Sequence, residues 1–200
     1  MEKQFAQWME EECSQIGVTL SEKQMEQFFQ YYEMLIQWNE VMNLTAITEM
    51  DQVVTKHFVD SMSLVKAVSE LGSKEIWIMD LGTGAGFPGI PLKIAFPNLK
   101  LTLLDSLNKR VKFLNEVIGT LGLEKIEAVH VRDLLGLTGY IRGGCSPVGM
   151  KKKFPTFFDE SAREWEQITV SAGVRGMVLL LNTADIVRFT DATVEDVTGT

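Results

Sequence analysis

The residues best suited to chemistry lie in one stretch, where a carboxylate is followed by a loop rich in glycine. Asp80 comes after an apolar run, and Gly82, Gly84 and Gly86 follow it at every second position. Glycine adopts positive φ angles at little cost and lets a ligand approach the backbone closely. A second apolar run ends at Asp105, roughly 20 residues after the first glycine, the offset at which an acid meets a ribose hydroxyl in nucleotide-binding folds. The stretch therefore predicts a site for a nucleotide-type cofactor.

The elements that must position these residues are a strand, a turn, a helix and a second strand. Apolar runs at 76–79 and 101–104 predict the strands, and residues 90–95 predict the helix between them. The glycine spacing differs from the Gly-x-Gly-x-x-Gly pattern of dinucleotide sites. It resembles the first motif of the S-adenosylmethionine-dependent methyltransferases, whose sulfonium cofactor has no phosphates to cradle and tolerates a neighbouring carboxylate. The alternative is a structural glycine turn in another α/β protein.

Composition narrows the class of protein. The chain has 200 residues, 46% of them hydrophobic, and a net charge of −8, which argues against indiscriminate nucleic-acid binding but not against a local basic patch. Cys13 and Cys145 suggest neither a disulfide framework nor a metal site. The start of the chain lacks an apolar signal core, and no uninterrupted apolar run reaches 18 residues. We therefore expect a cytoplasmic protein with no metal and no membrane partner.

Helices are expected before the glycine loop. Residues 4–16 predict the first helix, and Ser21 with Gln24 predicts a capping box at the start of the second. The second helix should bury one stripe of apolar side chains, namely Met25, Phe28, Phe29, Tyr32 and Ile36. A later helix carries His57, for which a hydrogen-bonded structural role is favoured over a catalytic one.

A helix capped by Asn108 and a third strand over 126–131 should follow Asp105. The first turn of this helix carries three cations, Lys109, Arg110 and Lys112. They fit a solvated helix face and a phosphate-contacting edge equally well.

Four motifs, taken in order, carry a specific resemblance over about residues 1–130. They are Trp38-Asn39 with Asn43-Leu-Thr45, then Lys56-His-Phe-Val-Asp-Ser61, Asp80-Leu-Gly-Thr-Gly-Ala-Gly-Phe-Pro-Gly89, and Leu104-Asp-Ser-Leu-Asn-Lys-Arg-Val-Lys-Phe-Leu114. This arrangement resembles the bacterial small-subunit rRNA guanine-N7 methyltransferases, the glucose-inhibited division protein B family. The resemblance implies S-adenosylmethionine as cofactor and small-subunit ribosomal RNA as partner.

The same resemblance implies the cofactor-binding residues. Gly82 and Phe87 match cofactor contacts of the family, and Asp105 matches the ribose-side acid. Asp133 and Leu134 stand where the family has an Ala-Glu pair near the adenine, and the family's later arginine has no counterpart. The expected cofactor-binding set is Asp80, Gly82, Gly84, Gly86, Phe87, Asp105, Asp133 and Leu134.

From residue 133 onward the sequence resembles a different family. Residues 137–152, 157–161 and 170–176 resemble the C-terminal half of the YbaK-type Cys-tRNA(Pro) deacylases, which implies tRNA as a second partner. Backbone N–H groups at Gly143 and Gly144 could form an oxyanion site, and Ser171 matches the family's substrate-side serine. Cys145 is favoured as a small buried residue over a nucleophile, because no histidine accompanies it.

The editing-like segment should also contain a strand over 177–181 and a short helix capped by Thr183. Residues 193–197 resemble the family's final helix.

The expected fold class is α/β. It comprises an N-terminal helical cap with the first half of a Rossmann-like methyltransferase sheet, residues 1–132, and then a partial α+β editing segment, residues 133–200. The expected function is S-adenosylmethionine-dependent methylation of guanine N7 in small-subunit rRNA, impaired by the truncation of the methyltransferase domain. A Cys-tRNA(Pro) deacylase and an inactive chimera are the alternatives. A natural gene fusion and an artificial junction near residue 132 both fit the sequence.

Overall fold

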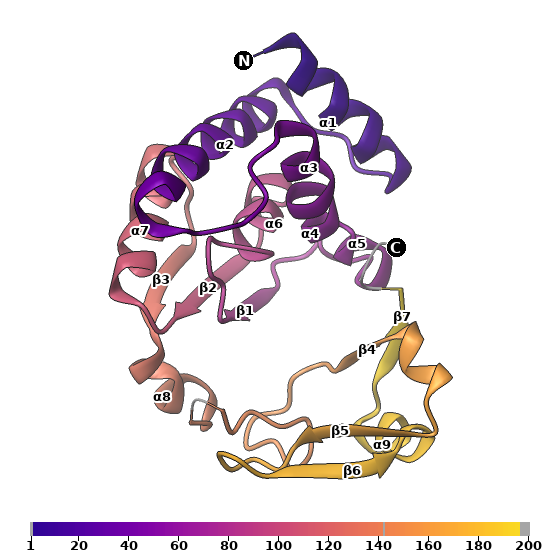
Figure 1. Ribbon diagram of the computed structural model, residues 1–200. Helices are drawn as coiled ribbons and strands as arrows, with labels where there is room; N and C mark the ends of the chain where they lie inside the picture. The colour runs from indigo at the N-terminus through magenta and orange to yellow at the C-terminus, as the bar shows by residue number, and fades with distance from the viewer. Residues whose placement is uncertain (1, 142, 197–200) are drawn as a thin grey trace. The chain divides into compact units, whose positions relative to one another are not determined.

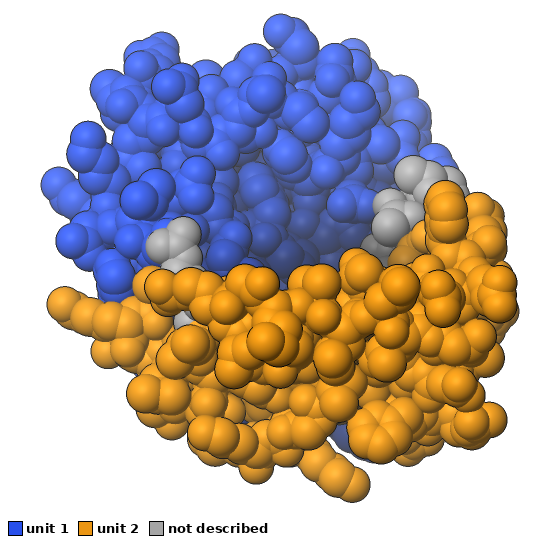
Figure 2. All heavy atoms as spheres, turned by 60° about the horizontal axis from the view of Figure 1, so that its bottom comes forward, with its two compact units in different colours: residues 1–130 blue, residues 131–200 orange. Residues whose placement is uncertain are grey.

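The chain forms two compact units, residues 1–130 and residues 131–200 (Figure 2). The computed structural model describes residues 2–141 and 143–196. The first unit combines helices with a parallel sheet, and the second contains two small two-stranded sheets.

Helices open the first unit. The long helix α2 begins with the predicted capping box: the Ser21 hydroxyl accepts from the Gln24 N–H, and the Gln24 amide oxygen accepts from the Ser21 N–H. The segment before the sheet runs as short α-helical pieces around a π-helical turn, η1. The bounds are α1 (Lys3–Gln15), α2 (Glu22–Met42), α3 (Met50–Val53), η1 (Val54–Val59), α4 (Asp60–Met62) and α5 (Leu64–Ala67).

The sheet of the first unit has three parallel strands in the order β1-β2-β3, joined by two helices. The bounds are β1 (Trp77–Leu81), α6 (Gly89–Ala95), β2 (Lys100–Asp105), α7 (Asn108–Thr120) and β3 (Ile126–His130). Parallel pairing places Asp80 opposite Leu103 and Asp105 opposite His130, so both acids lie at the carboxyl end of the sheet. The predicted α/β fold class is confirmed.

The core of this unit lies between the helices and one face of the sheet, as Figure 1 shows. Phe28, Phe58, Phe113 and Leu103 are fully buried there. The predicted stripe of α2 is partly wrong: Tyr31 and Leu35 are fully buried, whereas Tyr32 and Ile36 are only partly buried. The stripe is displaced because the aromatic cluster around Phe58 receives Tyr31.

The other face of the sheet carries a row of hydrogen bonds across all three strands. The Trp77 indole N–H donates to the Thr102 hydroxyl at 3.2 Å, and that hydroxyl donates to Glu127 Oε1 at 3.0 Å. Trp77 and Leu81 are each 47% exposed. Thr102 and Leu104 of β2 share this face and are each only 2% exposed, so the face is exposed along the edge strand β1 and buried along the central strand.

The second unit alternates short strands and turns. Strands β4 and β7 pair in parallel, and β5 and β6 pair antiparallel. The bounds are η2 (Val131–Asp133), α8 (Leu134–Thr138), β4 (Phe157–Asp159), η3 (Glu160–Glu164), β5 (Gln167–Ser171), β6 (Val178–Asn182), α9 (Thr183–Thr190) and β7 (Thr193–Glu195).

Three local predictions are wrong. Asn108 and Thr183 are the first residues of α7 and α9, not their N-caps. For α9 the cap is Asn182, whose side chain accepts from the Asp185 N–H. The predicted final helix is strand β7 as far as it is described, because its backbone pairs with β4; Val197 lies outside the described residues.

Across residues 2–141 and 143–196, no helix is both long and apolar enough to cross a membrane. Within the same residues, no three side chains of His, Cys, Asp or Glu come together as a metal site.

Candidate functional site

The glycine loop between β1 and α6 is tied to the end of the neighbouring strand. The N–H groups of Gly82 and Thr83 both donate to the Leu104 carbonyl, at 2.7 and 3.2 Å. The Thr83 carbonyl in turn accepts from the N–H groups of Gly86 and Phe87, at 2.8 and 3.0 Å. The loop is therefore a closed turn with a defined shape above β2.

Two glycines of the loop show why the sequence needs this residue type. Gly82 has a φ of +83°, and a Cβ there would meet nothing within 4 Å. Gly86 has a φ of +103°, and a Cβ there would lie 2.5 Å from Ile90 Cδ1 and 2.8 Å from Tyr31 Oη. Gly86 is therefore required for packing inside the protein, whereas Gly82 keeps open a space beside the backbone.

The Asp80 carboxylate forms hydrogen bonds with the glycine loop and with the start of α6. Its Oδ2 accepts from the Thr83 hydroxyl at 2.7 Å and from the Gly89 N–H at 3.0 Å, so one carboxylate connects the loop with the start of α6. A Cβ at Gly89 would lie 2.2 Å from Leu103 Cδ2, which explains the glycine there. Burial raises the pKa of Asp80 to about 6, against the opposing effect of its two hydrogen bonds.

Asp105 ends β2 and contacts the loop from the side. Its Oδ2 accepts from the Gly84 N–H at 3.1 Å and lies 3.4 Å from Arg110 Nη1, and its Oδ1 accepts from the Leu107 N–H at 2.8 Å. The residue is only 3% exposed. The carboxylate predicted to meet a ribose thus also fixes the middle of the glycine loop.

The helical cap contacts the loop at two positions. The buried Tyr31 hydroxyl donates to the Ala85 carbonyl at 2.5 Å. The His57 ring stacks on Phe87, with ring centroids 4.4 Å apart and ring planes 16° apart. Burial of His57 lowers its pKa, which favours the neutral ring.

Sequence reasoning missed Thr83 and Tyr31. Thr83 lies among the glycines, and a hydroxyl three residues after a strand-ending acid is a signal that could have been used. Tyr31 and Tyr32 fit the helical period equally well, so only the folded structure shows that Tyr31 is the buried one.

The three cations after Asp105 have different roles. Arg110 is half-buried and forms an ion pair with Asp105, whereas Lys109 and Lys112 are exposed. Arg110 thus belongs to the loop's support, and the two lysines keep both of their predicted interpretations.

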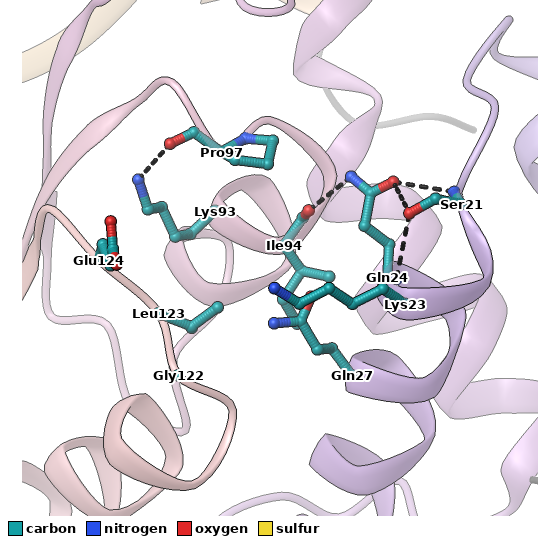
Figure 3. Close-up of a pocket in the computed structure, with 10 residues that line it drawn as sticks. All are labelled: Ser21, Lys23, Gln24, Gln27, Lys93, Ile94, Pro97, Gly122, Leu123 and Glu124. Carbon is teal, nitrogen blue, oxygen red and sulfur yellow. Dashed lines mark hydrogen bonds between the residues drawn. The ribbon is translucent and has the colours of Figure 1, made fainter.

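A cleft of about 420 Å³ lies near the far end of α6, away from the glycine loop (Figure 3). Gln24 Nε2 donates to the carbonyls of Ile94 and Ala95 there, at 2.8 and 2.9 Å, and Gln27 Nε2 donates to Leu121 at 2.7 Å. The polar groups of the cleft thus already hydrogen-bond α2 to α6 and to the end of α7. We therefore assign the cleft a role in helix packing and not in ligand binding. The lining residues are Ser21, Lys23, Gln24, Gln27, Lys93, Ile94, Pro97, Gly122, Leu123 and Glu124.

The remaining predicted residues lie in the second unit. Asp133 ends η2 and is exposed, and Leu134 begins α8 and is buried. The loop with Gly143 and Gly144 lies beside the turn after Ser171, since a Cβ at Gly144 would lie 2.9 Å from the Gly173 carbonyl oxygen. The Gly144 N–H, one of the proposed oxyanion donors, already donates to the Ile141 carbonyl at 2.9 Å.

The sequence model of the family described as rRNA small subunit methyltransferase G matches residues 24–133, and that of the aminoacyl-tRNA editing domain matches residues 109–189. Both resemblances expected from the sequence are thereby confirmed.

Curated relatives named ribosomal RNA small subunit methyltransferase G match the same part of the chain. The protein of Lachnoclostridium phytofermentans is 56% identical over 118 residues, 58% of this chain and 48% of the relative. That of Alkaliphilus metalliredigens is 54% identical over 120 residues, with shares of 60% and 49%. That of Thermoanaerobacter sp. strain X514 is 51% identical over 132 residues, with shares of 66% and 54%.

The chain thus spans about half the length of the curated relatives it matches. The matched residues contain the helical cap, the glycine loop and both acids. On this match the chain belongs to the rRNA small subunit methyltransferase G family.

Proposed function

We propose that the first unit binds S-adenosylmethionine at the glycine loop. The observation that carries this proposal is the open space at Gly82, next to a loop whose other positions are fixed by hydrogen bonds. The two carboxylates fit a cationic nucleoside. Asp80 and Asp105 both lie at the carboxyl end of the sheet, where open α/β sheets bind ligands.

Each residue has a distinct part in this proposal. Gly82 lets the cofactor approach the backbone, and Asp80 sets a negative field beneath the loop. Asp105 would accept from ribose hydroxyls in place of the Gly84 N–H. The edge of the proposed cofactor site is formed by Gly84, Gly86 and Phe87. Asp133 and Leu134, which stand where the family has its Ala-Glu pair, are proposed as the adenine-side residues.

The proposed reaction is methylation of small-subunit rRNA, the substrate class in the names of the relatives, and the proposed atom is guanine N7, as the sequence resemblance implies. The cofactor, when bound, supplies a methyl group on a sulfonium sulfur. Guanine N7 carries a free lone pair, so the protein needs no general base and contributes by orientation, which can be worth several kcal/mol. With such a substrate, the compartment that we propose is the cytoplasm.

Isothermal titration with S-adenosylmethionine and its demethylated product tests the cofactor proposal. We expect weak binding, because each missing adenine-side contact costs roughly 0.5–1.5 kcal/mol. The Asp105→Ala variant should bind more weakly still, whereas Asp51→Ala, at an exposed position in α3, should bind like the unchanged protein. Equal affinity for Asp105→Ala and the unchanged protein would remove Asp105 from the site.

A second candidate function is deacylation of Cys-tRNA(Pro) by the segment from residue 133 to 200. The approach of the Gly144 loop to Gly173, next to Ser171, favours it, as does the match to the editing family. Against it, the Gly144 N–H is already engaged with Ile141, which leaves Gly143 as the remaining glycine donor.

Turnover should be near background in both assays. The sheet described for the first unit has three strands, the first half of the expected methyltransferase sheet, so a guanine opposite the loop should be poorly oriented, and a displacement of about 1 Å can cost roughly 100-fold in rate. Methylation of small-subunit particles and hydrolysis of Cys-tRNA are the measurements. Robust turnover in either assay would contradict this expectation.

A further inference from the structure

We propose that His57 is a positioning residue of the cofactor loop, acting through the ring of Phe87. This inference rests on the proposed function, because it assigns to the helical cap the task of shaping the cofactor site. It concerns a residue for which the sequence favoured a local structural role.

The stacking of the two rings is the first observation. With centroids 4.4 Å apart and planes 16° apart, the His57 ring covers one face of Phe87. Phe87 is partly buried and also packs near Tyr31 and Phe58, with centroids 5.7 and 6.2 Å away, so His57 is the nearest of three rings that limit its rotation. The last residue of the loop before Pro88 is thereby held by an element outside the sheet.

The orientation of His57 is fixed in turn by the segment that follows α2. The Thr45 hydroxyl lies 2.8 Å from His57 Nε2, and the same oxygen accepts from the Ile47 N–H at 3.0 Å. The Thr45 N–H donates to Asn39 Oδ1 at 2.9 Å. A chain of hydrogen bonds thus runs from α2 through Thr45 to the ring that rests on the loop.

The backbone at His57 is the third observation. His57 lies in η1, the π-helical turn Val54–Val59, and such turns are rare and occur frequently at functional sites. The next residue, Phe58, stacks under Tyr31 with centroids 5.4 Å apart, and Tyr31 donates to the Ala85 carbonyl. Two adjacent residues of one turn therefore support the loop: His57 stacks on Phe87, and Phe58 packs near Phe87 and against Tyr31.

The expected loss on removing the His57 ring is about 2- to 10-fold in cofactor affinity, the range that corresponds to one aromatic pair. A double-mutant cycle on the full chain, titrated with S-adenosylhomocysteine, uses His57→Ala, Phe87→Leu and both together. Because His57 acts through Phe87, the double variant should lose no more affinity than Phe87→Leu alone. Additive losses, or no loss in His57→Ala, would overturn the proposal.

Two further variants separate positioning from general stability. His57→Phe keeps the stack and should restore most of the affinity, even where His57→Ala unfolds too easily for titration. Lys56→Ala alters an exposed side chain in the same turn and should bind like the unchanged protein. A His57→Phe variant that binds as weakly as His57→Ala would contradict the role of the stack.

Nuclear magnetic resonance distinguishes failure of this inference from failure of the proposed function. The chain contains two histidines, so the ring protons of His57 can be assigned with a single His130→Gln variant. They should be displaced upfield by the Phe87 ring, without cofactor, and the displacement should vanish in Phe87→Leu. A displaced signal with no cofactor binding would leave the ring contact standing and refute the cofactor site; an undisplaced signal would refute the inference itself.

Discussion

Replacing Gly82 with alanine tests whether the open space at the loop serves a ligand. A residue with a Cβ at a φ of +83° costs roughly 1–2 kcal/mol of stability. No atom lies within 4 Å of the added methyl group, so packing adds nothing to this cost. A bound cofactor, however, would have to move away from the backbone by about the size of a methyl group. We therefore expect a modest loss of stability with a loss of affinity of at least about 10-fold, typical of one displaced contact of 1.4 kcal/mol.

Gly122 provides the matched control. It has a φ of +60°, again with no atom within 4 Å of a Cβ, but it lies after α7 rather than at the loop. Gly122→Ala should therefore show a similar loss in the free energy of unfolding and an unchanged affinity. Both variants are compared by urea denaturation and by titration with S-adenosylhomocysteine. If Gly82→Ala binds as well as Gly122→Ala, no ligand approaches the backbone at Gly82 and the reasoning fails.

Two further predictions concern the supports of the loop. Folding raises the pKa of Asp80 from 3.8 to about 6, so between these pH values the folded state binds a proton that the unfolded state has lost. The free energy of unfolding should therefore fall by about 3 kcal/mol as pH rises from about 4 through 6. Asp80→Asn should remove this component in denaturation curves recorded from pH 4 to 8. Tyr31→Phe deletes a buried hydrogen bond to Ala85 and should cost about 1–3 kcal/mol and weaken cofactor binding. Tyr32→Phe, which loses an exposed contact to Thr48 at 3.2 Å, should cost much less in the same urea titration, and equal losses would contradict the role given to Tyr31.

The sheet of the first unit could be predicted because its signals are local. Strands β1 and β2 each contain an apolar run, and the acids that mark the site are the next-to-last residue of β1, Asp80, and the last residue of β2, Asp105. The η1 turn could not be predicted, since it forms only where His57 and Phe58 meet partners distant in sequence. Strand β7 was mistaken for a helix for the same reason. It is held by β4, 36 positions earlier in the pairing of Phe157 with Thr193.

The hydrogen bonds of the Gln24 side chain to α6 have a consequence for folding during synthesis. The carbonyls that its amide group binds belong to Ile94 and Ala95, 70 and 71 residues later in the chain. At synthesis rates of 5–20 residues per second, the ribosome needs about 4 to 14 seconds to cover that distance. During the first part of this interval α2 presents Phe28 and Tyr31 without Phe58, their ring partner 30 and 27 residues later in the chain. The hydrogen bonds between α2 and α6 therefore form only after β1, the glycine loop and α6 have been synthesised.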